Sequence, residues 1–420
     1  MTDRALRILV LSPIEPFPVI GGWQTVIYND IKYLSGRGHR MHVLALTYDP
    51  SRDPHDLSDV AEAEYFLIHK RPKWLQVAAN LGRSLPYTIV RHHDERLVRR
   101  ATELVRGDAV DVVLVEDVVM GRYAGLLKRA AKMPVFLRGH NVSTVVCQRF
   151  YETQRHPILR FLGRRQYRKF ARFESAVMET FDGVSQISPS DAEEARRLNP
   201  RVEQQVLLSG VDLDYFALAP FEGRDQDAVV HVGTLDGITK LPAMLWFYDR
   251  VLPRVRAKRP SARLELVGRM PSCRLRQSQR ADLVVHGPVP DVRPYLAKGG
   301  AFIAPQFVGS GIRVKILHAM ATGNAVVATT VACEGLPVTD GEEIFLADDE
   351  VTFAERVVQL LADAALRETM GLRARRLVEG RFGWPRIAEE LERHLRRAMA
   401  RCRRAGEASA AEAAGPVPLA

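Results

Sequence analysis

The sequence predicts an α/β protein with two domains, each built on a Rossmann-like parallel sheet. Short apolar runs rich in valine, isoleucine and leucine alternate with stretches whose apolar residues recur at helical spacing. Such alternation is typical of parallel sheets covered by helices. It occurs twice, on either side of a polar stretch at residues 220–227. A chain of 420 residues is long enough for each domain to bury its own core.

The first half of the chain supplies the first sheet. Gly21 and Gly22 lie in the loop after its first strand, and His140, in the sequence RGHN, directly follows a later strand. Ligands of such sheets bind beyond the carboxyl ends of the strands, so these residues are candidates for ligand binding. The alternative is a plain turn at the glycines and a structural histidine. The strands are expected at residues 6–11, 41–46, 111–115, 135–137 and 185–188.

The second half repeats this arrangement. Gly233 and Thr234 follow its first strand, and Gly268 and Arg269 follow its second, again at the edge where ligands bind. The strands are expected at residues 229–232, 264–267, 283–286, 301–304 and 325–329.

A glycine turn feeds a helix in the stretch GSGIRVKILHAMATG. Backbone N–H groups at such a helix start are unpaired and attract anions, and Ser310 is expected to cap the helix. Arg313 and Lys315 add positive charge, which suits a diphosphate. The alternative is a tight turn with two solvated basic residues. The turn residues expected to contact phosphate are Gly309, Ser310, Gly311 and Ile312.

The composition limits the class of partner. The formal net charge of +10 indicates an anionic partner, for which nucleic acid, anionic lipid and a nucleotide sugar are candidates. Nucleic acid is the least favoured, because no zinc-finger spacing or RNA-binding aromatic signature occurs. No apolar run approaches the ~20 residues of a membrane span, so a cytoplasmic protein is expected. The four cysteines lack metal-ligand spacing, and no metal site is predicted.

Residues 149–172 form a basic amphipathic stretch in which arginines alternate with aromatic and aliphatic residues. One interpretation is a helix that lies on an anionic membrane surface, which would place the protein at the inner face of the membrane as a peripheral protein. The other is a solvated helix face.

Several motifs together resemble glycosyltransferase family 4. They are IGGWQTVIYNDIKYLSGRGHRMHVLAL, RGHN, SGVDLDYF, VVHVGTLDGITKLPAMLWFYDRVLPRV and GSGIRVKILHAMATGNAVVATTVACEGL. The resemblance implies the two-domain GT-B fold, with an acceptor-binding domain at residues 1–217 and a donor-binding domain at residues 218–384. It also implies a helix at residues 385–404 that crosses back to the first domain. Residues 405–420 are rich in alanine with few bulky apolar residues, so they are expected to be disordered.

The resemblance also implies roles for the candidate residues. It places Gly21 and Gly22 against the donor phosphates, His140 near the transferred sugar, and Lys240 with the diphosphate. Three positions depart from the family pattern. Ser310 and His318 stand where the family commonly has two glutamates, the second of which binds the ribose, and Thr234 stands where many members have arginine. His318 is therefore either a ribose ligand or a packing residue. The residues expected near the nucleotide base are Gly268, Arg269 and Val289.

The implied reaction is that of a retaining hexosyltransferase. A sugar would pass from a nucleoside-diphosphate sugar to the hydroxyl of a glycan, lipid-linked or small-molecule acceptor, with His140, Arg313 and Lys315 as the catalytic residues. Fixed positive charge at the leaving diphosphate makes a metal or other cofactor unnecessary. Two alternatives stay open. A sugar-nucleotide epimerase, which shares the architecture, would turn over the donor without an acceptor, whereas a non-catalytic relative would bind nucleotide without transferring sugar.

Overall fold

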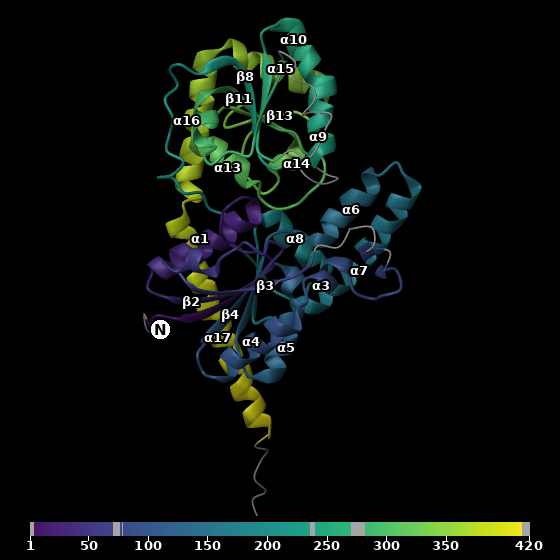
Figure 1. The fold of residues 1–420 in the computed structure, drawn as a ribbon, viewed down its shortest axis with the longest axis vertical. Coiled ribbons are helices and arrows are strands. Elements are labelled where there is room, and N and C mark those ends of the chain that lie inside the picture. Colours follow the sequence, from purple (N-terminus) through teal and green to yellow (C-terminus); the bar gives the residue numbers. More distant parts are fainter. Residues whose placement is uncertain (1–3, 70–75, 78, 236–239, 270–281, 414–420) are drawn as a thin grey trace, which may run out of the picture. The chain divides into compact units, whose positions relative to one another are not determined.

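The computed structural model describes residues 4–69, 76–77, 79–235, 240–269 and 282–413. The chain separates into two compact units, of which the first comprises Met1–Leu207 with Ile387–Ala420 and the second Leu208–Arg386. Each unit is a parallel sheet packed with helices (Figure 1). The two predicted Rossmann-like sheets are therefore confirmed.

In the part of the chain that the structure describes, the first unit has a seven-stranded sheet in the order β3-β2-β1-β4-β5-β6-β7, with every neighbouring pair parallel. The central strands are runs of buried β-branched and aliphatic residues, as parallel sheets covered on both faces require. The strands are β1 (Arg7–Ser12), β2 (Arg40–Thr47), β3 (Glu62–Leu67), β4 (Val112–Glu116), β5 (Val135–Gly139), β6 (Gly183–Gln186) and β7 (Gln204–Val206).

The helices of the first unit follow its strands in the chain. Their ends carry ordinary caps, such as Asp94, whose side chain accepts from the backbone N–H groups of Arg96 and Leu97 at the start of α4. The helices are α1 (Gly22–Gly36), α3 (Tyr87–Arg91), α4 (Glu95–Arg106), α5 (Arg122–Ala130), α6 (Ser143–Thr153), α7 (Pro157–Met178) and α8 (Pro189–Leu198), with 3-10 turns at Pro54–Leu57 and Val118–Met120.

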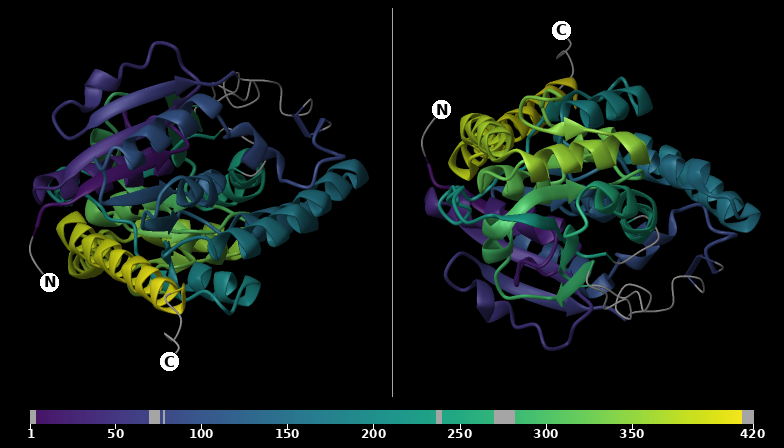
Figure 2. Two further views of the ribbon diagram at one scale, coloured as in Figure 1. Left: turned by 90° about the horizontal axis from the view of Figure 1, so that it is seen from below. Right: turned by 90° about the horizontal axis from the view of Figure 1, so that it is seen from above.

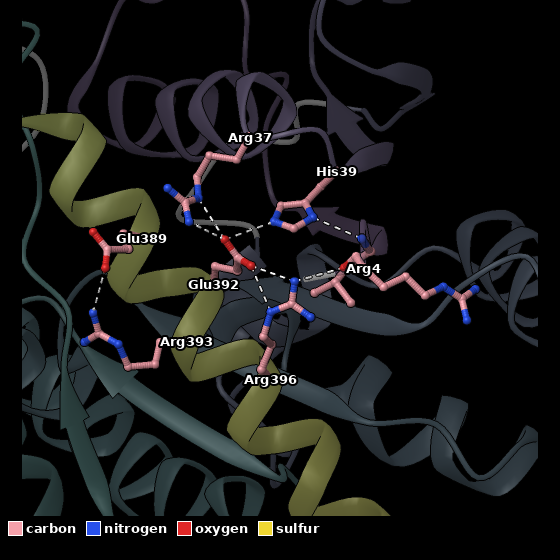
Figure 3. A network of polar contacts seen from close by, with 8 residues as sticks. Arg4, Arg37, His39, Glu389, Glu392, Arg393 and Arg396 are labelled. Carbon is pink, nitrogen blue, oxygen red and sulfur yellow. Dashed lines mark hydrogen bonds and ion pairs between the residues drawn. The ribbon is translucent and has the colours of Figure 1, made fainter. Parts of the chain in front are cut away.

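Helix α17 (Trp384–Ala413) belongs to the first unit from Ile387 onward. Its Glu392 accepts hydrogen bonds from Arg37 at 2.7 Å and from Arg396 at 2.8 Å, and lies 3.3 Å from His39 (Figure 3). Burial raises the pKa of Glu392, but the hydrogen bonds from Arg396 and Arg37 outweigh burial and lower this pKa to about 2. The helix is thereby fixed to α1 and the start of β2.

The end of α17 corrects one expectation. Disorder was expected from residue 405, yet the helix continues to Ala413. The alanine-rich composition explains this difference, because alanine has the highest helix propensity of all residues. Residues 414–420, the rest of the predicted tail, lie outside the described residues.

The second unit has a six-stranded sheet, counted over its described residues, in the order β10-β9-β8-β11-β12-β13 and again parallel throughout. The strands are β8 (Asp225–Val232), β9 (Arg263–Val267), β10 (Leu283–Gly287), β11 (Gly299–Ala304), β12 (Val326–Ala328) and β13 (Phe345–Leu346). Its helical segments are α9 (Lys240–Trp246), a π-helical stretch at Phe247–Val251, α10 (Leu252–Lys258), α12 (Arg293–Lys298), α13 (Val314–Ala321), α14 (Thr330–Cys333), α15 (Glu350–Ala362) and α16 (Ala364–Arg381).

The second unit begins at Leu208, earlier than the boundary expected after residue 217. Residues 208–217 are held in the second unit by contacts with its last residues. Val211 donates its N–H to the carbonyl of Phe382 at 2.7 Å, and a Cβ at Gly210 would lie 2.5 Å from the indole of Trp384. Gly210 therefore permits a contact that no side chain would allow.

Candidate functional site

The predicted glycines of the second unit lie together at one edge of its sheet. Gly233 follows β8 and Gly268 follows the neighbouring β9. Gly268 has a φ of +127°, and a Cβ there would lie 2.4 Å from the carbonyl oxygen of Gly233, so only glycine allows this approach. Its N–H donates to Gly287 at the end of β10 at 2.7 Å. The structure thus brings to this edge Gly233, Thr234, Gly268, Arg269 and Val289.

Lys315 meets a buried histidine at the same edge. His231 in β8 is 1% exposed, and its Nδ1 lies 2.9 Å from the carbonyl oxygen of Ile303. A carbonyl only accepts, so Nδ1 carries the proton and Nε2 accepts from the Lys315 ammonium at 3.4 Å. Burial, and then the charge of Lys315, lower the pKa of His231 well below its usual value. Burial, and then the charges of Lys240 and Arg313, lower the pKa of Lys315 to about 7.

Arg313 holds the loop between β11 and α13. Its Nη1 donates to the carbonyl oxygen of Ser310 at 2.5 Å and also to that of Gly311. Gly309 has a φ of +148°, and a Cβ there would lie 2.8 Å from Nη2 of Arg313 and 2.5 Å from the side chain of Gln306. Arg313 is 9% exposed, and its guanidinium lies against the loop backbone, so its first role here is to fix the shape of this loop.

The start of α13 differs from the prediction. The helix begins at Val314, and its N-cap residue is Arg313, which makes no side-chain capping bond. Ser310 therefore does not cap this helix. Residues 310–312 precede the first turn, because the positive φ of +81° at Gly311 turns the chain before the helix can start. The N–H groups of that first turn belong to Val314 and Lys315 instead.

His318 lies in α13 and stacks on Phe216, with ring centroids 3.9 Å apart and an angle of 14° between the rings. Burial lowers the pKa of His318 to about 3, so the ring is neutral at pH 7. The packing role expected as one alternative is thus present in the structure, and ribose binding stays a prediction.

The first unit carries a second group of candidate residues at the carboxyl edge of its sheet. Glu116 ends β4, and His140 follows the neighbouring β5. The Nε2 of His140 lies 2.6 Å from a carboxyl oxygen of Glu116, and both side chains are buried. Burial raises the pKa of Glu116 to about 7 and lowers that of His140 to about 4. The ring of Trp23 packs edge-on against that of His140, with the ring centroids 6.5 Å apart.

A buried ion pair lies within this second group. Arg138 of β5 pairs with Asp30 of α1, and Arg138 also donates to the carbonyl of Leu207 at 3.1 Å. Asp117, directly after β4, has a φ of +74°, a conformation that non-glycine residues rarely adopt and that is enriched at functional sites. Burial raises the pKa of Asp30 to about 7.

Gly21 and Gly22 begin α1 of the first unit. Gly21 is the N-cap residue, and its carbonyl accepts from the N–H of Thr25 at 2.9 Å and from its hydroxyl at 3.0 Å. A Cβ at Gly22 would meet nothing within 4 Å, so the backbone here is open to a ligand. These glycines and His140 belong to the first unit, whereas Lys240, Arg313, Lys315 and His318 belong to the second.

Sequence reasoning missed several buried residues in these groups, among them the four residues His231, Glu116, Asp30 and Arg138. Three of them gave a signal that went unused. His231 is the only polar residue in the apolar run VVHV, and Glu116 and Arg138 each stand at the end of an apolar strand. Asp30 lies inside a helix and gave none.

Two family profiles match the chain in succession. The profile described as Glycosyltransferase Family 4 matches residues 20–215, and that described as Glycosyl transferases group 1 matches residues 226–363. The chain belongs to glycosyltransferase family 4. The family expected from the motifs is thereby confirmed, and each profile covers most of one sheet of this family 4 member.

Two curated proteins resemble parts of this family 4 chain. A phosphatidyl-myo-inositol mannosyltransferase of Mycolicibacterium smegmatis is 30% identical over 196 residues, which are 44% of this chain and 50% of that protein. An uncharacterized 44.6 kDa protein in the cps region of Klebsiella pneumoniae is 27% identical over 139 residues, 31% of this chain and 36% of that protein. The chain thus matches half or less of the length of these relatives.

Solved structures show the same fold over nearly the whole chain. Sucrose-phosphate synthase from Thermosynechococcus elongatus has a TM-score of 0.70 at 17% identity, with 94% of this chain and 99% of that one covered. HepE of Anabaena, solved with UDP and glucose, has a TM-score of 0.65 at 14% identity, with 92% and 98% covered. The family 4 chain therefore has the GT-B fold. Among its described helices, none is long and apolar enough to cross a bilayer.

Proposed function

We propose that this chain is a cytoplasmic glycosyltransferase that moves a hexose from a nucleoside-diphosphate sugar to an acceptor hydroxyl with retention of configuration. The single observation that carries the proposal is the Lys315–His231 contact at the carboxyl edge of the second sheet. It presents an ammonium group beside the close-packed glycine backbones of Gly233 and Gly268. A protein of the same fold, HepE of Anabaena, was solved with UDP and with UDP-glucose, which supports a nucleotide-sugar donor.

In the proposed reaction, negative charge builds on the leaving diphosphate. Lys315 would stabilise this charge together with the N–H groups at the start of α13, since fixed dipoles and charges in a water-poor site act strongly on developing charge. Lys240 is close enough to Lys315 to lower its pKa and would contact the same anion. Because these protein groups supply the positive charge, the proposal includes no metal or other cofactor.

Arg313 acts in this proposal mainly on the loop. Arg313 donates to the carbonyl oxygens of Ser310 and Gly311. In the proposal these oxygens point away from the anion, and the opposite side of each peptide, which carries the N–H, faces it. His140 is proposed to contact the transferred sugar as a neutral imidazole, and the leaving phosphate to take the proton of the acceptor hydroxyl. This mechanism needs no carboxylate base.

The testing experiment is titration calorimetry of the full chain with UDP, GDP, ADP and dTDP. We expect a clear preference for one nucleotide, and a loss of affinity of roughly tenfold or more in Lys315→Ala, the size of a charge-assisted contact. Lys240→Ala should lose less, because Lys240 is exposed. Lys258→Ala is the matched control, since this lysine is exposed at the end of α10 in the same unit. If Lys315→Ala and Lys240→Ala both bind like wild type, the diphosphate site lies elsewhere.

The same titration carries the test of His318. Tighter nucleotide binding by His318→Glu would place that side chain on the ribose, whereas unchanged affinity would make it only the packing partner of Phe216.

Incubation with the preferred sugar nucleotide separates the transferase from its alternatives. Conversion of the donor to a different sugar nucleotide without any acceptor would identify an epimerase. Nucleotide binding with no transfer to any acceptor class, and no donor hydrolysis, would identify a non-catalytic relative.

A further inference from the structure

Helices α6 and α7 form a hairpin that projects to one side of the first unit's sheet (Figure 1 and Figure 2). The two helices pack tightly, because a Cβ at Gly163 would lie 2.8 Å from the Cβ of Tyr151. The rings of Tyr151 and Tyr167 meet with centroids 5.5 Å apart. The hairpin is therefore a packed element of the fold. Its far end is the turn from α6 into α7, where α7 begins at Pro157.

Large apolar side chains are exposed at that far end. The exposed fractions are 62% for Ile158, 43% for Leu159 and 56% for Phe161, all in the first turns of α7. Leu81, which is 37% exposed, adjoins them through Arg165. This arginine donates to the Leu81 carbonyl at 2.7 Å, and its guanidinium carbon lies 5.9 Å from the Phe161 ring centroid. We call these four apolar residues the hairpin tip.

Arginines surround the hairpin tip. Between Glu152 and Glu174 the sequence contains no acidic residue. Within the described part of the chain, none of the exposed arginines of this stretch has a carboxylate partner. These are Arg155, Arg160, Arg164, Arg165, Arg168 and Arg172.

The helical spacing puts Ile158, Phe161 and three of the arginines on the same side of α7. Phe161 and Arg165 are four residues apart, and Arg168 and Arg172 follow at intervals of three and four. Residues at these intervals share one face of a helix. The opposite face is buried against the first unit, and its residues include Gly163, Gln166, Phe170, Glu174 and Val177.

We propose that the hairpin tip docks on the surface of an anionic lipid bilayer, with Ile158, Leu159 and Phe161 inserted among the headgroups and the arginines paired with lipid phosphates. Exposed apolar residues combined with cations that no described carboxylate neutralises are what interfacial helices use, whereas a site for nucleic acid needs no exposed aliphatic side chains. A second copy of this surface is excluded as partner by like charge. Docking would give the protein access to a lipid-linked acceptor, and this purpose rests on the proposed function. The docking itself is argued from the surface of α7 and does not depend on that function.

The experiment is flotation of the full chain with vesicles of phosphatidylcholine alone and of phosphatidylcholine with 30% phosphatidylglycerol, an amount on the order of natural anionic membranes. We expect binding only to the anionic vesicles. Replacing three cations in Arg160→Gln/Arg164→Gln/Arg168→Gln should weaken binding roughly 100-fold, and Ile158→Ser/Phe161→Ser at least roughly tenfold. The matched control is Arg373→Gln/Arg376→Gln/Arg381→Gln, which removes the same charge from exposed sites on α16.

Several results would overturn the proposal. One is that the wild-type protein does not float with anionic vesicles. Another is that the α16 control loses as much vesicle binding as the α7 arginine variant, which would mean that net charge alone explains binding. Binding to single-stranded RNA that is stronger than to vesicles and lost in the same arginine variant would assign the surface to nucleic acid. Because flotation uses neither donor nor acceptor, its outcome is independent of nucleotide titration. Unchanged circular dichroism and nucleotide affinity of the variants would show that the fold is intact.

Discussion

Lys315 donates a hydrogen bond to Nε2 of His231 across 3.4 Å, and the other nitrogen of that imidazole donates to the carbonyl of Ile303. Among the residues that the structure describes, the lysine is thus held by a neutral acceptor and not by a carboxylate. An ammonium group whose partner is uncharged keeps its full electrostatic attraction for an anion. The pair therefore fixes a cation in place without neutralising it.

The first prediction concerns the pH dependence of nucleotide affinity. A bound diphosphate favours the charged form of Lys315, whose pKa is about 7 in the free protein. Affinity should therefore be constant below about pH 7 and fall as pH rises above it, with proton uptake on binding. The last ionisation of a phosphate has a pKa near 6 and is largely complete by about pH 7, so it contributes little above that pH. Calorimetry at pH 6.5, 7.5 and 8.5 in two buffers of different ionisation enthalpy measures this uptake.

Lys315→Met is the control for this titration. It should bind nucleotide more weakly and with affinity that no longer falls between pH 7 and pH 8.5. Proton uptake that persists in Lys315→Met would mean that another group titrates.

The second prediction is that His231→Phe weakens nucleotide binding roughly tenfold at pH 7.5. The replacement keeps an aromatic ring but removes the acceptor of Lys315, and a hydrogen bond to a charged group contributes about 1.5–3 kcal/mol. The remaining loss should shrink at pH 6, where Lys315 regains its proton. Calorimetry at both pH values measures the difference. An affinity equal to that of wild type at pH 7.5 would show that His231 does not position the lysine.

The third prediction concerns the contact of Gly268 with Gly233. Gly268→Ala should lower the free energy of unfolding by about 1–3 kcal/mol through backbone strain alone, and further because its Cβ would overlap the Gly233 carbonyl. It should also abolish nucleotide binding. Gly341→Ala is the matched control, since Gly341 has a φ of +81° but an open surrounding. Urea denaturation and calorimetry separate strain from overlap, and equal losses in both variants would contradict the role assigned to the contact.

The fourth prediction concerns Glu116 as the residue that positions His140. Glu116→Gln can still donate to Nε2 of His140 and should keep most activity. Glu116→Ala should lower kcat roughly 10- to 100-fold, as loss of an oriented acid–base partner does, with little change in donor KM. Steady-state assays with the preferred sugar nucleotide measure both. Glu174→Gln, another buried carboxyl that accepts from Ser143 and Thr144, should change stability but not kcat. A Glu116→Gln variant as impaired as Glu116→Ala would argue against positioning through a hydrogen bond.

The fifth prediction concerns Glu392 on α17, whose folded pKa of about 2 lies below its ordinary value of 4.5. Its stabilising contribution is present above about pH 4.5 and is lost as pH falls toward 2. Glu392→Gln should therefore lower the free energy of unfolding by about 1–3 kcal/mol at pH 7, and by progressively less between pH 4.5 and pH 3. Urea denaturation at these pH values measures the difference.

The control for Glu392 is Glu389→Gln, one turn earlier on the same helix. Glu389 pairs with Arg393 at 3.4 Å, and both side chains are more than half exposed. Exposed pairs of this kind contribute at most about 0.5 kcal/mol. A loss in Glu389→Gln as large as in Glu392→Gln would mean that the helix responds to charge in general and not to the network in Figure 3.

The strands of both sheets could be predicted because their residues form continuous apolar runs. β3 escaped prediction because Glu62 and Glu64 alternate with apolar residues at the edge of the sheet, where one face meets water. β7 and β13 are too short for any pattern, with three and two residues. Gly323, just after the end of α13, has the positive φ of +73° that a glycine at this position commonly adopts.

The candidate site was predictable only where a motif marks it. The loop at residues 309–312 and Lys315 stood out because glycines and cations are adjacent in the sequence. The partners of these residues come from other strands, as His231 does from β8, and spacing along the chain cannot reveal such contacts. The capping role given to Ser310 was wrong, because Gly311 turns the chain before the helix begins.

The last residues of the chain complete the first unit. Ala398 packs on Gly183, and the ring of His394 lies 6.0 Å from that of Phe136 in β5. During synthesis, the ribosome must therefore translate the whole second unit before the first can close. Until then Phe136 and its neighbours stay exposed. Exposed apolar surface of this kind is what chaperones bind on a nascent chain. A chain cut at residue 386 would lack not a tail but part of the core of its N-terminal half.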